Sequence, residues 1–117
     1  MDSISLQGRV AVKSSASKAL GKLSAQLQPD SNDFVAIEDG VLVIDIGHCD
    51  APTGFHAVAC KAVSDFCDKY ATAGAVFDID GSTLVVGPGA QARKDAHAAH
   101  LLARIKALTL ELERVLA

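Results

Sequence analysis

Aromatic residues are scarce in this sequence, which has no tryptophan, one tyrosine and four phenylalanines among 117 residues. A core must therefore be filled by valine, leucine, isoleucine and alanine, and half of the residues are apolar. Cysteine is scarce too. Cys60 and Cys67 lie seven positions apart on a predicted helix, about 10 Å along its axis, which is too far for a disulfide. We therefore expect free thiols and a reducing, cytoplasmic setting.

Long hydrophobic runs and concentrated positive charge are also missing. Apolar runs such as Val41 to Ile44 are far shorter than the roughly 20 residues that cross a bilayer, and the first residues do not resemble a secretory signal. Acidic residues outnumber basic ones, giving a net charge of −3. No basic stripe is present that could bind phosphates. We expect one domain over residues 1–117, with neither a membrane nor a nucleic acid as partner.

Two Asp-Gly pairs, Asp39-Gly40 and Asp80-Gly81, each separate two apolar runs. Such a pair favours the type I′ turn of a two-residue β-hairpin, because both central residues need a positive φ. The pattern predicts hairpins over residues 34–47 and 75–87. In the first hairpin, Leu42, Ile44 and Ile46 point to one face, and Val41 and Val43 point to the other.

Three amphipathic helices are predicted around these hairpins. Apolar residues recur at helical spacing over residues 16–27, over residues 55–70, and between about residue 90 and the C-terminus. We expect Ser14, Ser15 or Ser17 to cap the first helix, Asp50 or Thr53 to cap the second, and Gly74 to end the second. Residues 4–12 form either a strand or a weak hairpin. The sequence thus predicts an α+β fold, an antiparallel sheet from hairpins with three amphipathic helices, in the order β-α-ββ-α-ββ-α.

The last helix carries a regular apolar stripe. Its members follow a 4-3-4-3 spacing and are Leu101, Ile105, Leu108, Leu112 and Val115. Because the stripe covers only about two heptads, a coiled coil is disfavoured. We expect it to pack across the sheet.

Four residues around the start of the second helix are the best metal-ligand candidates: His48, Cys49, His56 and Cys60. His56 and Cys60 are four residues apart and share a helix face, as paired ligands must. A cysteine such as Cys60, beside an apolar helix face, is more often a small core residue than a metal ligand. The adjacent His48 and Cys49 are likewise better explained as a loop at a strand end than as a catalytic pair. We assign no catalytic residue, no metal site and no cofactor.

Two further polar groups have alternative interpretations. Asp45 and Asp78 are either a carboxylate pair facing each other across the sheet or solvated strand positions. Gly87-Pro88-Gly89, followed by Arg93 and Lys94, is either an anion site at a helix N-terminus or a plain turn. The turn is the commoner outcome, since no phosphate-binding motif is present.

The order of elements resembles the class I chaperones of bacterial type III secretion. The matching parts are the Ala16–Leu27 helix, the Phe34–Gly47 strands, the Phe55–Tyr70 helix, the hairpin over residues 75–86 and the Ala99–Leu116 helix. The resemblance implies a nonenzymatic, cytoplasmic homodimer that holds a segment of a secreted effector extended. It implies a dimer interface at Phe55, Val58, Ala62, Phe66 and Val76. It implies partner binding at Leu20, Leu23, Leu27, Val35, Ile37, Val41 and Val43.

Two alternatives stay open beside this resemblance. The element order is also similar to the roadblock/LC7 fold, which would imply a dimeric regulatory scaffold for a nucleotide-binding protein. The second alternative is a small metal-binding protein or enzyme that uses the His48, Cys49, His56 and Cys60 group. The amount of apolar surface helps to choose between these hypotheses. Apolar residues lie on both faces of the predicted strands, which is more than a small domain easily buries alone, and this favours dimerisation or peptide capture.

Overall fold

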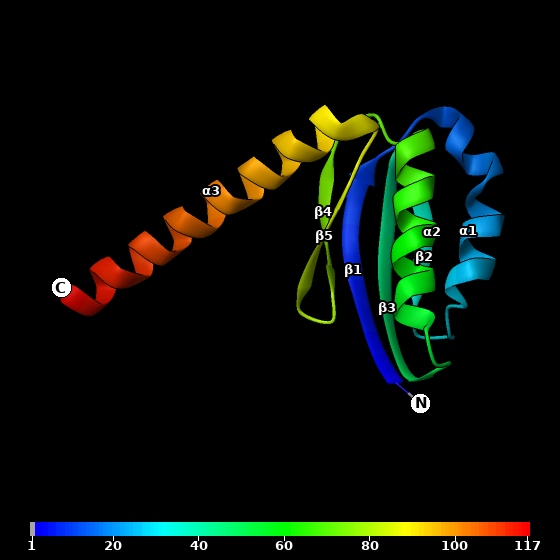
Figure 1. The fold of residues 1–117 in the computed structure, drawn as a ribbon, viewed down its shortest axis with the longest axis horizontal. Coiled ribbons are helices and arrows are strands. Elements are labelled where there is room, and N and C mark those ends of the chain that lie inside the picture. The colour runs from blue at the N-terminus through cyan, green and yellow to red at the C-terminus, as the bar shows by residue number, and fades with distance from the viewer. Residues whose placement is uncertain (1) are drawn as a thin grey trace.

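The computed structural model describes residues 2–117, leaving aside the side chains of residues 2 and 48–50. Its elements are β1 (Asp2–Ala11), a short 3₁₀ helix η1 (Ser14–Lys18), α1 (Leu20–Leu27), β2 (Phe34–Glu38), β3 (Val41–Ala51), α2 (Phe55–Tyr70), β4 (Ala75–Ile79), β5 (Ser82–Val86) and α3 (Gly89–Leu116). One antiparallel sheet and three helices confirm the predicted α+β fold and the predicted order of elements (Figure 1).

The strands form a single sheet in the order β2-β3-β1-β4-β5. Residues 4–12 are therefore a strand and not a hairpin, and β1 lies at the centre of the sheet, antiparallel to both β3 and β4. Packing requires a glycine at position 8 of β1, because a Cβ at Gly8 would lie 2.4 Å from the ring of Phe77. The missing side chain leaves room for this fully buried ring beside the central strand.

Both Asp-Gly turns have the predicted geometry. Asp39 and Gly40 have φ angles of 51° and 75°, and Asp80 and Gly81 have φ angles of 53° and 80°. All four values lie in the left-handed region that a type I′ turn requires. The second turn is also tied to the central strand, because the backbone N–H of Ser5 donates to Asp80 Oδ1 over 2.8 Å.

The helices α1 and α2 cover one face of the sheet, and the core lies between these two layers (Figure 1). Leu42, Ile44 and Ile46 of β3 point into this core and are buried, whereas Val41 and Val43 lie half-buried on the outer face. The predicted alternation of β3 is therefore confirmed. From α2, the core receives a list of mostly small or aromatic residues: Phe55, Ala59, Ala62, Val63, Phe66 and Cys67.

The predicted helix ends were wrong at the start of the first helix and at the end of the second. The first helix is divided, because η1 precedes α1, and neither has a side-chain cap. Gly54, in a left-handed conformation, is the residue before α2, and the predicted cap Asp50 lies outside the described side chains. Ala71 ends α2 in an extended conformation. Gly74 instead lies against α3, where a Cβ would come within 2.2 Å of the Ala92 carbonyl oxygen.

The helix α3 begins at the sheet and then projects from the body as an arm (Figure 1). Its start is fixed by Asp68, whose Oδ1 accepts from the Gly89 N–H at 3.2 Å and from Arg93 Nη1 at 3.3 Å. Arg93 also donates to the Gly87 carbonyl at 3.2 Å. From residue 101 to the C-terminus every residue is exposed.

Candidate functional site

The exposed arm of α3 carries the largest group of exposed apolar side chains among the described residues. Its five regularly spaced members, which we call the α3 stripe, are from 42% to 76% exposed: Leu101, Ile105, Leu108, Leu112 and Val115. Three more exposed leucines, Leu102, Leu110 and Leu116, lie on the same segment. Single exposed leucines are ordinary, but a continuous row of this length makes the arm a candidate interaction surface.

The prediction that this stripe packs across the sheet was wrong. Only the first three turns of α3 contact the sheet, through a side marked by half-buried Ala92, Ala96 and His100. At 100° per residue the α3 stripe lies more than a third of a turn (roughly 130°) from that side. The stripe therefore faces neither the sheet nor α1 and α2, and nothing in the described chain covers it.

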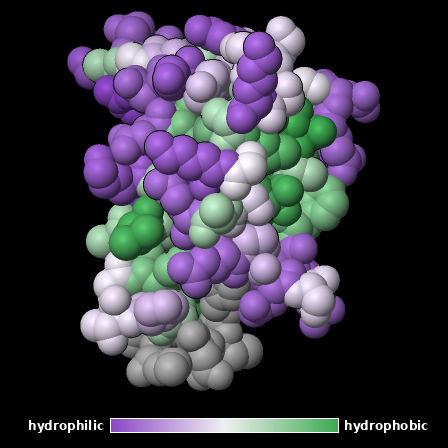
Figure 2. Space-filling view, turned by 90° about the vertical axis from the view of Figure 1, so that its right-hand side faces the viewer, coloured by the Kyte–Doolittle hydropathy of each residue, from purple (hydrophilic) through white to green (hydrophobic). Residues whose placement is uncertain are grey.

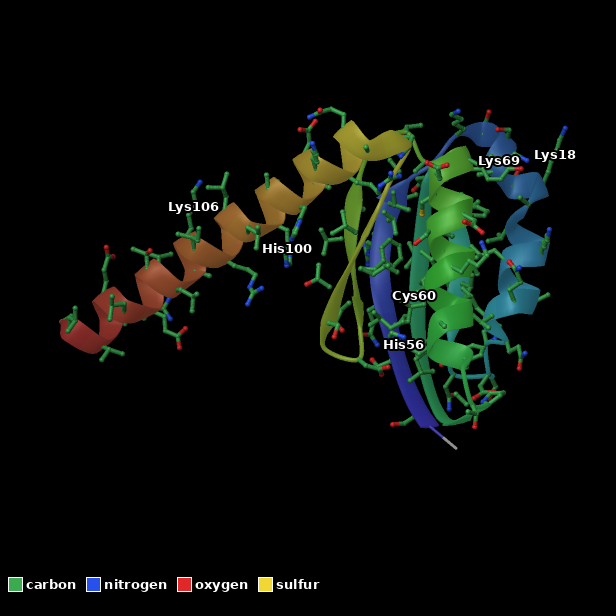
Figure 3. All side chains as sticks on the ribbon, in the orientation of Figure 1. Lys18, His56, Cys60, Lys69, His100 and Lys106 are labelled. Atoms are coloured by element: carbon green, nitrogen blue, oxygen red, sulfur yellow. The ribbon has the colours of Figure 1, made fainter. Side chains whose placement is uncertain are left out.

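The direction of α3 explains this exposure. Gly87 and Gly89 have φ angles of 152° and 86°, so the chain leaves β5 in a conformation that side chains rarely adopt. Figure 3 shows the consequence: His100 lies on the side of α3 toward the sheet, whereas Lys106 extends from the arm into open space. The Gly87-Pro88-Gly89 segment thus acts as a turn that aims α3.

The outer face of the sheet is a second candidate surface. Phe34, Val41 and Val43 surround a shallow depression of about 480 Å³ on this face, together with Arg9 and Asp45. Phe34 is an exposed aromatic residue on β2, which is an edge strand. An edge strand with apolar neighbours is a surface to which an extended peptide can add.

Asp45 and Asp78 do not form the carboxylate pair that was one interpretation. Gln7 of the central strand pairs with Asp45 on one side and with Asp78 on the other. The two aspartates are therefore two strand spacings apart, about 10 Å. Asp45 accepts from Gln7 Nε2 at 3.4 Å, and Asp78 accepts from the Gly81 N–H at 2.9 Å. Both are solvated strand positions, which was the other interpretation.

A third surface is the groove between α1 and α2, with a volume of about 360 Å³. Leu23, Ala62 and Phe66 lie in it beside the lysines Lys61 and Lys69. Lys61 is held by Asp65 at 3.0 Å, one turn along α2. Figure 2 shows the surface over the two helices as mainly hydrophilic, with hydrophobic residues between the charged ones.

The five residues predicted for a dimer interface do not lie on one surface. Phe55, Ala62 and Phe66 are buried, the last two where α2 faces α1, and Val58 is half exposed in the same groove. Val76 lies on β4 beside the buried Phe77, so it points to the opposite face of the sheet. The three buried residues hold the chain's own core together. The interface role of the group stays a prediction.

The residues predicted for partner binding are also divided by the sheet. Leu23 and Leu27 are buried in the core, and Leu20, Val35 and Ile37 pack partly buried against it. The remaining two, Val41 and Val43, lie on the outer face beside Phe34. The two valines lie on the outer face of the sheet, which neither α1 nor α2 covers, so an extended segment could reach them without displacing these helices.

The two cysteines whose side chains the structure describes, Cys60 and Cys67, are free, and a raised pKa keeps both thiols neutral. Cys60 Sγ lies 3.9 Å from His56 Nδ1, and both side chains are labelled on α2 in Figure 3. Burial raises the pKa of Cys60, and the negative charge of Asp80 raises it further. Burial raises the pKa of Cys67 to about 12. A neutral thiol is a poor nucleophile and a poor metal ligand. Among the side chains that the structure describes, no three metal-ligating groups converge. His48 and Cys49 lie outside the described side chains.

Comparison of the chain with protein-family models, with curated proteins and with solved structures found no significant match. None of the helices in the described chain combines the length and hydropathy that a membrane span needs. The apolar row of α3 could be predicted from the sequence, whereas its exposure was not predicted. The sequence contains one signal for this exposure, because the α3 stripe lies on a different side of the helix from the alanines near its start.

Proposed function

We propose that this protein is a nonenzymatic, homodimeric binding protein that holds a segment of another protein in an extended form in the cytoplasm. The order and size of its elements, which resemble those of type III secretion chaperones, agree with that role. The single observation that supports it best is the exposed α3 stripe, because a binding protein needs apolar surface that the isolated chain leaves open.

The arm of α3 supports the dimeric part of this proposal. Most helical stability in proteins comes from packing an apolar face and not from the helix alone. Residues 101–116 have no such packing within the chain. A second polypeptide that covers the α3 stripe would supply it.

The edge strand β2 supports the partner-binding part. One side of β2 pairs with β3, and its other side forms an edge of the sheet. Phe34, Val41 and Val43 lie beside this edge on the outer face. A segment added to β2 would gain backbone hydrogen bonds from the edge and side-chain contacts from these three residues, the usual mode of strand addition.

The experiment that tests the dimer is light scattering of the purified full chain between about 1 and 100 µM. We expect the mass of two chains at the upper concentrations. The mass of one chain throughout this range would contradict the dimeric function.

The partner-binding part is tested separately with a β2 variant. Phe34→Glu places a charge beside the edge strand without touching the core, and Ser31→Glu in the adjacent loop serves as its matched control. From a library of extended ten-residue peptides, we expect some to bind both the wild-type chain and the Ser31→Glu variant but not the Phe34→Glu variant. Peptides bound equally by all three proteins, or by none, would contradict strand addition at β2.

A further inference from the structure

We infer that α3 pairs with α3 of a second copy in an antiparallel arrangement, with Leu101 opposite Leu112 of the partner subunit. The inference rests on the proposed homodimer and specifies its interface. It is carried by three properties of residues 98–116: the spacing of the apolar residues, the placement of the charges and the length of the exposed arm.

The spacing of the α3 stripe allows a self-complementary register. When Leu101 faces Leu112 of the partner subunit, Ile105 faces Leu108 of the partner subunit, and small Ala98 faces Val115 of the partner subunit. The two-fold axis then passes between positions 106 and 107, so each contact occurs twice, as an isologous interface requires. Every member of the stripe is covered.

Neighbouring antiparallel registers are less favourable. A shift of one heptad toward the N-terminus places Lys94 opposite Leu112 of the partner subunit, which would bury a charge in the interface. A shift of one heptad toward the C-terminus would pair Leu108 with Leu112 of the partner subunit and would leave Leu101 with no stripe residue opposite it. Only the central register covers the whole stripe with apolar residues.

Charge selects the antiparallel direction over the parallel one. Arg104 and Glu111 occupy equivalent flanking positions one heptad apart, on the same edge of the α3 stripe. In the antiparallel register Arg104 lies beside Glu111 of the partner subunit, and the symmetry repeats the pair. In a parallel, in-register pair Arg104 would lie beside Thr109 of the partner subunit, and Glu111 beside Leu116 of the partner subunit. The parallel pair therefore forms no ion pair across these flanks.

The length of the arm fits this arrangement. The overlap of residues 98–115 spans about 27 Å of helix. Of the half-buried residues on the sheet side of α3, only His100 falls within this overlap. Since the α3 stripe is turned away from the sheet, a second helix can lie along it without displacing the contacts between α3 and the sheet. The two bodies would lie at opposite ends of the paired helices.

Cross-linking tests the direction and register. We would prepare Leu101→Cys and Leu112→Cys chains, both also carrying Cys49→Ser and Cys60→Ser, and give one chain a tag that changes its mass. Circular dichroism checks that each chain folds. After mixing and mild oxidation, we expect disulfides between Leu101→Cys and Leu112→Cys chains and almost none between identical chains. Identical positions would be roughly 16 Å apart along the axis, which a disulfide cannot bridge. Cross-links between identical chains would overturn the antiparallel arrangement.

Charge reversal supplies an independent readout. Arg104→Glu and Glu111→Arg each place like charges side by side at two symmetric positions, so each should raise the dimer dissociation constant on the order of tenfold. The double variant restores both pairs in reversed order and should return the constant to within about threefold of the wild type. Single variants without effect, or a double variant no better than the singles, would overturn the pairing.

The outcomes separate this inference from the proposed function. A chain that stays monomeric contradicts the dimeric function itself. A dimer that forms no cross-link in either mixture, and ignores the charge reversals, uses another surface, which overturns the inference and leaves the dimeric function standing.

Discussion

Leu108 lies at the centre of the α3 stripe, and its replacement by alanine gives the most quantitative prediction. Burial of a whole leucine side chain contributes about 1.5–3 kcal/mol, and Leu108 is 61% exposed in the single chain. A partner that covers it therefore gains about 1–2 kcal/mol per copy. Because the dimer contains two copies, and because alanine keeps one of the four side-chain carbons of leucine, Leu108→Ala should weaken dimerisation by about 2–3 kcal/mol. That change raises the dissociation constant roughly 30- to 150-fold.

Leu110 supplies the matched control for this variant. It is 57% exposed, nearly the same as Leu108, but two residues at 100° each place it on the opposite side of α3. Alanine keeps the helix propensity in both variants. Analytical ultracentrifugation should find a weakened dimer for Leu108→Ala and an unchanged dimer for Leu110→Ala. Equal effects of the two variants would refute the argument that one side of α3 forms the interface.

Two further predictions concern the core. Gly8→Ala should destabilise the fold by about 1–3 kcal/mol, because the new methyl group would overlap the buried ring of Phe77. Gly47→Ala, with nothing within 4 Å of its new Cβ, should be nearly neutral in the same denaturation assay, and equal losses would contradict this account of Gly8. Burial raises the pKa of Cys67 from 9.0 to about 12, so the contribution of its neutral thiol to the free energy of unfolding is fully present below pH 9. That contribution falls by about 1.4 kcal/mol per pH unit above it. Cys67→Ala should flatten the decline of unfolding free energy between pH 9 and 11, and identical slopes would count against the assignment.

Local rules predicted the hairpins correctly. The Asp39-Gly40 and Asp80-Gly81 turns depend on the φ preferences of two adjacent residues, so the sequence contains all the information they need. The two faces of β3 followed from alternation alone, for the same reason. The order of the elements could be inferred from these local patterns together with the helical spacing of apolar residues.

Contacts between distant parts of the chain could not be predicted in this way. The sequence left residues 4–12 as either a strand or a weak hairpin, and the ring of Phe77, which arrives from β4, explains why a strand has a glycine at position 8. Asp45 and Asp78 suggested a pair, but the order of the strands places Gln7 between them. Strand order depends on tertiary packing that no local pattern encodes.

The candidate site shows the same division. The helical spacing of the α3 stripe was visible in the sequence, whereas its exposure depends on the direction that Gly87 and Gly89 give to α3. The predicted interface residues Phe66 and Val76 are equally apolar, and the sequence does not distinguish the core-facing residue from the one on the opposite face. Exposure after folding, rather than hydrophobicity, identifies the candidate surface.

Hydrogen exchange of the backbone amides of residues 101–116 tests most directly whether a second copy covers the α3 stripe. We predict slow exchange at about 100 µM chain and exchange approaching that of a free peptide after dilution to nanomolar concentration, because an unpaired arm of this length is marginally helical. Exchange of these amides at the same rate at both concentrations would contradict the central claim that two arms stabilise each other.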